Sequence, residues 1–147
     1  MKHTKEYDID FKKDLEFGLK WENKLKKILK DVKVEVKTDR KWSTTGNLAV
    51  EIESRNKPSG IKVTTAEYWS FILWEKDNDT PSIILISTDK LKIFVEFYLE
   101  KNGFIYGGDN RTSKLVLIPI NKVFNHSYFV EKVNAKDIIS WCRYFSL

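Results

Sequence analysis

The region from Val32 to Ser54 constrains the fold most, because it contains two short runs in which polar and apolar residues alternate. Successive side chains of a β-strand point to opposite faces of a sheet, so this alternation predicts two strands. A turn around Thr45-Gly46-Asn47 separates the runs, and we expect them to pair as a hairpin. One face of this hairpin is predicted to be aliphatic. The other face is predicted to carry five charged residues: Glu35, Lys37, Asp39, Glu51 and Glu53.

Four carboxylates would crowd the polar face of such a hairpin. Like charges on neighbouring strands repel and destabilise a sheet, and one lysine cannot neutralise four acids. A divalent cation would neutralise them, and oxygen ligands at this density suit Mg²⁺ or Mn²⁺ better than Zn²⁺. The alternative interpretation is that this face is simply the solvated side of an antiparallel sheet.

A helix is predicted before the first strand, from Asp14 to Lys30, after a loosely held lead-in over residues 1–13. Apolar residues recur at helical spacing along one face, at Leu15, Leu19, Trp21, Leu25, Ile28 and Leu29. Glu22 falls in the middle of this apolar stripe. Because a buried acid needs a partner, Glu22 either reaches the edge of the helix or faces the acidic patch and helps to hold a metal ion.

The rest of the chain predicts further short strands and two more helices. Strands are expected at Ser70–Trp74, Ser82–Ser87, Phe104–Tyr106 and Leu115–Pro119, with helical turns near Thr65–Tyr68 and Asn121–Phe124. Helices are expected at Asp89–Lys101, capped by Thr88, and at Ala135–Phe145. This order predicts an α/β fold with a mixed central β-sheet flanked by helices, in one domain that spans residues 1–147.

The composition indicates the cellular compartment in which we expect this domain to function. The chain contains no run of eighteen apolar residues and no apolar segment near its N-terminus, so we expect neither a membrane span nor a secretory signal. Its one cysteine, Cys142, excludes an intrachain disulfide, and we expect a cytoplasmic protein. One cysteine and two histidines do not favour a zinc site of the Cys/His type.

Net charge points to a polyanionic partner. The formal net charge is +5 and the pI is near 9.1, which suggests nucleic acid. A basic surface around a cluster of acids that needs a divalent cation is suited to hydrolysis of phosphodiester bonds. The basic surface attracts the nucleic-acid backbone, and the acids hold the cation.

Five segments stand out along the chain: VEVKTDR, TGNLAVEIESRNKPSGI and TTAEYW, followed later by GGD and LVLIPI. Together they resemble a group of small phage-type proteins of the PD-(D/E)XK nuclease superfamily. The resemblance covers most of the chain and is most specific between Val34 and Trp69. It implies a restriction-endonuclease-like αβββαβ core and Mg²⁺- or Mn²⁺-dependent hydrolysis of DNA, in the cytoplasm of a prokaryotic or phage-infected cell.

The resemblance implies a role for each matching residue. Asp39 and Glu51 take the positions of the metal-ligating acids, and Glu22 matches the helix glutamate, which is expected to reach the metal as well. Glu53 stands where the superfamily usually has lysine, and Lys37 is expected to supply the missing positive charge from the neighbouring strand. These five residues form the predicted catalytic set.

A second register of the motif is available within the first run. Glu35-Val36-Lys37 is itself an E-x-K, for which Asp31 or Asp14 would be the upstream aspartate. Asp31 is too close to Glu35 to lie on a separate strand, so Glu35 is held as a second-tier candidate.

The loops beside the acids are expected to hold the DNA backbone without reading its sequence. The predicted contacts are Arg40, Lys41, Thr45, Asn47, Arg55, Lys57, Ser59 and Lys62. Trp42 or Trp69 would stack on an unpaired base if not part of the core. Because Glu53 replaces the usual lysine, a second interpretation stays open. In it, the protein has the nuclease fold and binds nucleic acid or a protein partner but no longer cleaves DNA. A homodimer, and a basic domain whose polar sheet face is only solvated, are also left open.

Overall fold

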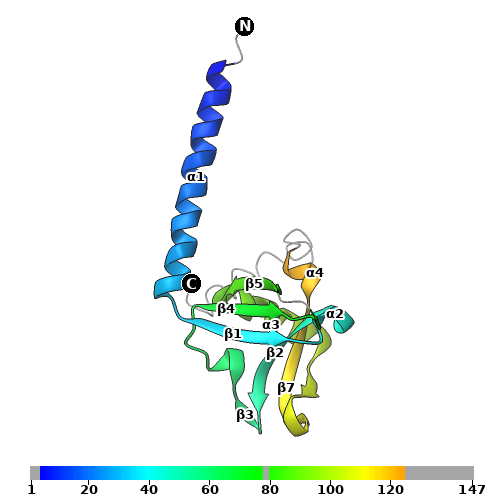
Figure 1. Cartoon of the computed structure of the whole chain (residues 1–147). Coiled ribbons are helices and arrows are strands. Elements are labelled where there is room, and N and C mark those ends of the chain that lie inside the picture. Colours follow the sequence, from blue (N-terminus) through cyan, green and yellow to red (C-terminus); the bar gives the residue numbers. More distant parts are fainter. Residues whose placement is uncertain (1–3, 78–79, 125–147) are drawn as a thin grey trace.

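The computed structural model describes residues 4–77 and 80–124 and consists of one long helix and a body of two β-sheets (Figure 1). The first elements are α1 (Thr4–Asp31), β1 (Val34–Asp39), α2 (Trp42–Thr45) and β2 (Asn47–Ser54). The middle of the chain forms β3 (Lys57–Pro58), the 3-10 helix η1 (Gly60–Lys62), β4 (Tyr68–Leu73), β5 (Ser82–Ser87) and α3 (Thr88–Asn102). The last described elements are β6 (Ile105–Gly107), η2 (Asp109–Arg111), β7 (Ser113–Pro119) and α4 (Ile120–Val123). The predicted helix at Ala135–Phe145 lies outside the described residues.

The strands form two separate sheets. Sheet A has the order β1-β4-β5 and is mixed, because β1 runs parallel to β4 and β5 runs antiparallel to it. Sheet B has the order β3-β2-β7-β6 and is antiparallel throughout. The predicted α/β class, with a mixed sheet and flanking helices, is confirmed. The strands are divided between two sheets, however, and do not all belong to one central sheet.

The predicted hairpin between β1 and β2 is wrong. Val34 lies opposite Tyr68 in the parallel pair of sheet A, whereas Val50 lies opposite Val116 in sheet B. The segment between the two strands is the short helix α2, which ends at Gly46 with a φ of 69° and is not a tight hairpin turn. Alternation shows which side chains share a face, but it does not identify the neighbouring strand. The chain therefore leaves sheet A after β1 and enters sheet B.

One hydrophobic core draws residues from both sheets and from α3. The apolar side of β2 is buried as predicted, and so is the equivalent side of β4 (Leu48, Val50, Ile52, Trp69, Phe71 and Leu73). The buried face of α3 is contributed by Leu91, Phe94, Val95 and Tyr98. These side chains bury large apolar areas, which is the main favourable term in folding.

The ends of α3 show one difference from prediction. The side chain of Ser87 caps the helix by accepting a hydrogen bond from the Lys90 backbone N–H at 3.3 Å. Thr88, the predicted cap, is buried instead, and its hydroxyl donates to the Ala66 carbonyl at 2.6 Å. Gly103 ends the helix with a φ of 71°, as expected for a C-terminal glycine.

Helix α1 is longer and more exposed than the sequence predicted. It begins at Thr4, so the expected loose lead-in is wrong from that residue onwards. Figure 1 shows α1 extending away from the two sheets. Ile28 is buried, whereas Leu15, Leu25 and Leu29 are exposed, so most of the apolar stripe does not pack on the core. Within residues 4–77 and 80–124, no helix is both long enough and apolar enough to cross a membrane.

Candidate active site

The polar side chains of β1 lie on the face of sheet A that continues the core. The register places them beside buried residues of β4, with Glu35, Lys37 and Asp39 opposite Trp69, Phe71 and Leu73. The aliphatic side of β1 faces outward, and Val36 is 56% exposed. The aliphatic and charged residues of β1 do lie on separate faces, and it is the aliphatic face that points away from the core. Because β1 is an edge strand, its inward-pointing charges can still reach solvent, and charges in this position also discourage pairing with another chain.

Glu35 and Lys37 neutralise one another. Their side chains form an ion pair with Nζ and Oε1 2.8 Å apart. The Lys37 ammonium also lies 5.5 Å from the centroid of the Trp69 ring, within the range of a cation–π contact. Lys37 is thus held on β1 by Glu35 and Trp69, and β1 is not the strand beside Glu53 as predicted, because the two strands belong to different sheets.

Asp39 is oriented by the backbone that follows β1. Its Oδ1 accepts a hydrogen bond from the Lys41 N–H at 2.9 Å, and its carbonyl accepts one from the Trp74 N–H at 3.0 Å. Trp42 also stabilises the segment after β1, because its indole N–H donates a hydrogen bond to the Trp74 carbonyl at 2.9 Å. Asp39 is half-buried, and it forms no ion pair within the part of the chain that the structure describes. Among the described residues, its carboxylate is therefore oriented by a neutral backbone N–H and not by a cation.

Glu51 is held by the loop that follows β3. The Ser59 hydroxyl donates to Glu51 Oε1 at 2.7 Å, and the Ser59 N–H donates to the Ile52 carbonyl at 3.2 Å. Gly60 has a φ of 55°, and a Cβ at this position would lie 2.2 Å from the Glu51 carbonyl oxygen. Only glycine fits such an approach. The close approach at Gly60 therefore allows the neighbouring Ser59 to place its hydroxyl on the Glu51 carboxylate.

Glu53 has a partner that sequence reasoning missed. Lys114 on β7 pairs with it, with Nζ and Oε1 2.8 Å apart. The hydrogen bond that the Lys114 ammonium donates to the Glu53 carboxylate raises the pKa of Lys114. The pairing register with β7 shifts between Glu51 and Glu53, so Glu51 lies opposite Leu115 and Glu53 lies opposite the adjacent residue Lys114. The partnership could not be read from the local pattern, because Lys114 is distant in the sequence and its register depends on this irregularity.

Glu22 lies on the exposed surface of α1. Its carboxylate pairs with Lys26 one turn later, at 2.8 Å, and the hydrogen bond and charge of Lys26 lower the pKa of the Glu22 carboxyl. Of the two interpretations, this structure corresponds to the exposed one. Helix α1, which carries Glu22, extends away from the two sheets (Figure 1), and among the described residues Glu22 shares no three-ligand metal group with Asp39 and Glu51.

The predicted metal ligands do not form one cluster in this arrangement. Carboxylate oxygens are the donors that Mg²⁺ and Mn²⁺ prefer. Among residues 4–77 and 80–124, however, no three His, Cys, Asp or Glu side chains are close enough to share a metal ion. The set of Asp39, Glu51 and Glu22 therefore does not fit a three-ligand site as the structure stands, and metal binding stays a prediction.

The predicted nucleic-acid contacts fall into two groups. The first lies between β1 and the start of β2 and contains Arg40, Lys41, Thr45 and Asn47. The second follows the end of β2 and contains Arg55, Lys57, Ser59 and Lys62. Strand β2 has eight residues, so its ends are roughly 23 Å apart at about 3.3 Å per residue. The contacts thus lie towards opposite ends of β2, and Glu51 lies between them.

Both tryptophans considered for base stacking are held by the protein itself. Trp69 is 1% exposed and belongs to the core. Trp42 is partly buried, packs against the core and donates its indole N–H to Trp74. The core interpretation therefore holds for both.

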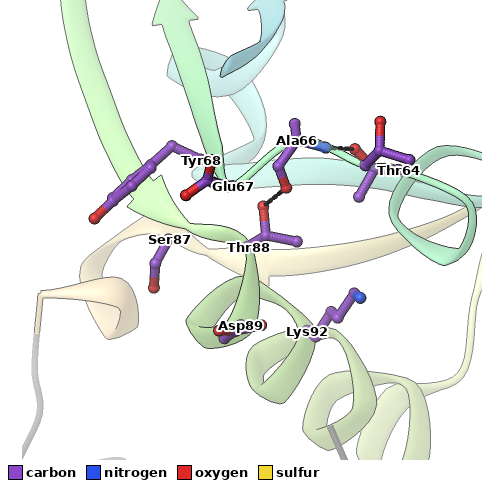
Figure 2. Close-up of a pocket in the computed structure, with 9 residues that line it drawn as sticks. Thr64, Ala66, Glu67, Tyr68, Ser87, Thr88, Asp89 and Lys92 are labelled. Atoms are coloured by element: carbon purple, nitrogen blue, oxygen red, sulfur yellow. Dashed lines mark hydrogen bonds between the residues drawn. The ribbon is translucent and has the colours of Figure 1, made fainter. Parts of the chain in front are cut away.

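A polar cavity of about 320 Å³ lies at the start of α3 (Figure 2). It is lined by residues 64–67 before β4, by Tyr68 at the start of β4, and by Ser87, Thr88, Asp89 and Lys92. Hydrogen bonds within its wall join Thr88 to Ala66, and Ala66 to Thr64. None of the predicted site residues lines this cavity. Part of the TTAEYW segment, which contributed to the resemblance, therefore lines a cavity separate from the candidate acids.

Comparison of the chain with protein-family models, curated proteins and solved structures finds no match.

Proposed function

We propose that this protein is a metal-dependent deoxyribonuclease of the PD-(D/E)XK type, in which Asp39 and Glu51 are the essential acids. The observation that supports this proposal is the kind of partner that each carboxylate has. Asp39 and Glu51 accept hydrogen bonds from neutral donors, a backbone N–H and a serine hydroxyl. The other candidate acids, including the second-tier Glu35, are each paired with a lysine: Glu22, Glu35 and Glu53.

A neutral donor orients a carboxylate without cancelling its charge. Asp39 and Glu51 therefore retain the charge that a divalent cation needs, whereas an ion-paired glutamate must first lose its lysine. A bound Mg²⁺ or Mn²⁺ would supply an activated water and would stabilise charge at the phosphorus. The type of hydrogen-bond partner therefore separates Asp39 and Glu51 from the other acids, and these two residues are the ones that match the acidic positions of the motif.

The basic side chains have a binding role in this proposal. A DNA strand that lies along β2 would meet Arg40 and Lys41 near one end and Arg55 and Lys57 near the other. Lysine and arginine contacts to phosphate supply affinity that does not depend on sequence. Such a path would bring the backbone past Glu51.

The test is a cleavage assay on supercoiled plasmid and single-stranded DNA with Mg²⁺ or Mn²⁺. The protein is expected to cut at least one substrate, and Asp39→Asn or Glu51→Gln to lower the rate by at least about a hundredfold, as for loss of a central electrostatic group. Glu35→Gln is the matched control, because Glu35 lies on the same strand as Asp39 but is already ion-paired. Equal losses in all three variants, or no cleavage of any substrate, would contradict the proposal.

A second candidate function is DNA binding without cleavage. The ion pair between Glu53 and Lys114 favours it, because the position that is usually a catalytic lysine holds a neutralised glutamate. In the same assay, salt-sensitive DNA binding without product in either metal would support this candidate over the nuclease.

A further inference from the structure

Helix α1 exposes an apolar stripe that nothing in the described structure covers. Phe11 is 67% exposed, Leu15 54%, Leu25 47% and Leu29 70%. A lone helix gains little stability in water, and most helices in proteins are stabilised by packing of their apolar face. An exposed stripe of this size therefore indicates a surface that binds another apolar element.

The spacing of this stripe is that of a helix that pairs with another helix. Its positions are separated alternately by four and three residues, and they are Phe11, Leu15, Gly18, Glu22, Leu25 and Leu29. We refer to these six residues as the α1 seam. Alternation of four and three is the heptad pattern of coiled coils. The 28 residues of α1 extend over roughly 42 Å, which is enough for three heptads to meet a partner.

The centre of the seam indicates the direction of pairing. A Cβ added to Gly18 would have no atom within 4 Å, so the protomer itself does not require a glycine there. In an antiparallel pair centred near residue 20, Gly18 lies opposite Glu22 of the second copy and leaves room for its side chain. The same register places Leu15 opposite Leu25 and Phe11 opposite Leu29. A parallel pair would instead bring the two Glu22 carboxylates together, where they would repel.

Charge along α1 is complementary in the same direction. Residues 4–17 contain three lysines and five acids, for a net charge of −2. Residues 18–31 contain five lysines and two acids, for a net charge of +3. Antiparallel pairing places the acidic half of one helix beside the basic half of the other. We propose that the protein is a homodimer in which the α1 seams of two copies pack in antiparallel orientation.

The mass of the full-length protein in solution tests the dimer. Sedimentation equilibrium is expected to give about twice 17.4 kDa, with a Kd that rises at least tenfold in Leu25→Asp. Phe17→Asp is the matched control, because Phe17 is 64% exposed on α1 but lies outside the seam, and its Kd is expected to stay within threefold of the wild-type value. A monomer at every concentration would overturn the proposal in favour of α1 folding back on its own sheets. Equal effects of the two substitutions would also overturn it.

Cross-linking tests the direction, in protein whose one cysteine is replaced by Cys142→Ser. Leu15→Cys mixed with Leu25→Cys is expected to form a disulfide-linked heterodimer under mild oxidation, whereas Leu15→Cys alone is expected to remain unlinked. Efficient linking of Leu15→Cys to itself would overturn the antiparallel arrangement. Neither assay depends on DNA cleavage, so the dimer and the nuclease proposal can fail separately.

Discussion

Gly60 shows how one backbone position determines the surroundings of a candidate catalytic acid. Its positive φ and its contact with the Glu51 backbone allow the loop to place the Ser59 hydroxyl on the Glu51 carboxylate. Glycine adopts this conformation without steric cost, whereas a residue with a Cβ does not. The geometry of Glu51 therefore depends on a residue that carries no side chain.

Gly60→Ala is expected to destabilise the protein strongly. The left-handed conformation alone costs an alanine about 1–2 kcal/mol, and the Cβ would also clash with the Glu51 carbonyl oxygen. Gly46→Ala is the matched control, because Gly46 has a φ of 69° but open space around a Cβ. Chemical denaturation should show a loss at Gly60 that exceeds the loss at Gly46 by at least about 1 kcal/mol, as expected for overpacking. Equal losses would mean that the loop moves away from Glu51 at little cost.

The sequence nominates candidate acids but not their partners. Strand alternation and the motif both single out Asp39 and Glu51, whose catalytic role stays a prediction. The contacts of Ser59 with Glu51, and of Lys114 with Glu53, depend on how a loop and a distant strand return to β2. Such contacts are set by tertiary structure, and no local pattern in one sequence specifies them.

At the scale of elements, the ends of a helix or strand could be predicted where residues next to it in the sequence terminate it. Strand β5 has the predicted bounds, Ser82–Ser87, because an apolar run is closed on both sides by turn and cap residues. The C-terminus of α3 followed from Gly103. The pairing of β1 was not predictable in the same way, since its partner β4 lies about thirty residues later and two sheets were available to it.

Helix α1 is expected to lose stability in acid through Glu22. Lys26 lowers the pKa of Glu22 below its ordinary value of 4.5, so the pair stabilises the helix above that pH and the contribution is lost as pH falls through the lowered pKa. Circular dichroism between pH 6 and 2 should show a smaller loss of helicity in Glu22→Gln than in the wild type. Glu16→Gln, on the same helix, is the control. Identical acid transitions in the wild type and Glu22→Gln would show that the pair does not support the helix.

At the scale of the whole molecule, the predicted phosphate contacts are divided between two places. The chain carries a net charge of +5, but the predicted phosphate contacts lie towards the two ends of β2. Each phosphate contact that releases a counterion contributes to the salt dependence of binding. The two groups can therefore be separated by experiment.

Arg55→Ala combined with Lys57→Ala is expected to lower the slope of log K against log salt for DNA binding by about 1 to 2, since each phosphate contact contributes roughly 0.9 for duplex DNA. Arg40→Ala with Lys41→Ala is expected to do the same if the strand follows β2 along its length. Lys12→Ala with Lys13→Ala on α1 is the control of equal charge. An unchanged slope in both loop variants would place the DNA path elsewhere.

The parallel pairing of β1 has a consequence for the order in which the chain assembles. Val34 meets Tyr68, so β1 has no neighbour until synthesis has passed the whole of β4. Strand β2 pairs with β7 later still, because Val50 lies opposite Val116. Contacts between residues this far apart close large loops and slow folding. A nascent chain that ends before Tyr68 therefore contains the motif residues Asp39 and Glu51 without β4, the central strand of sheet A, and β2 can pair with β7 only after a further fifty or so residues have been made.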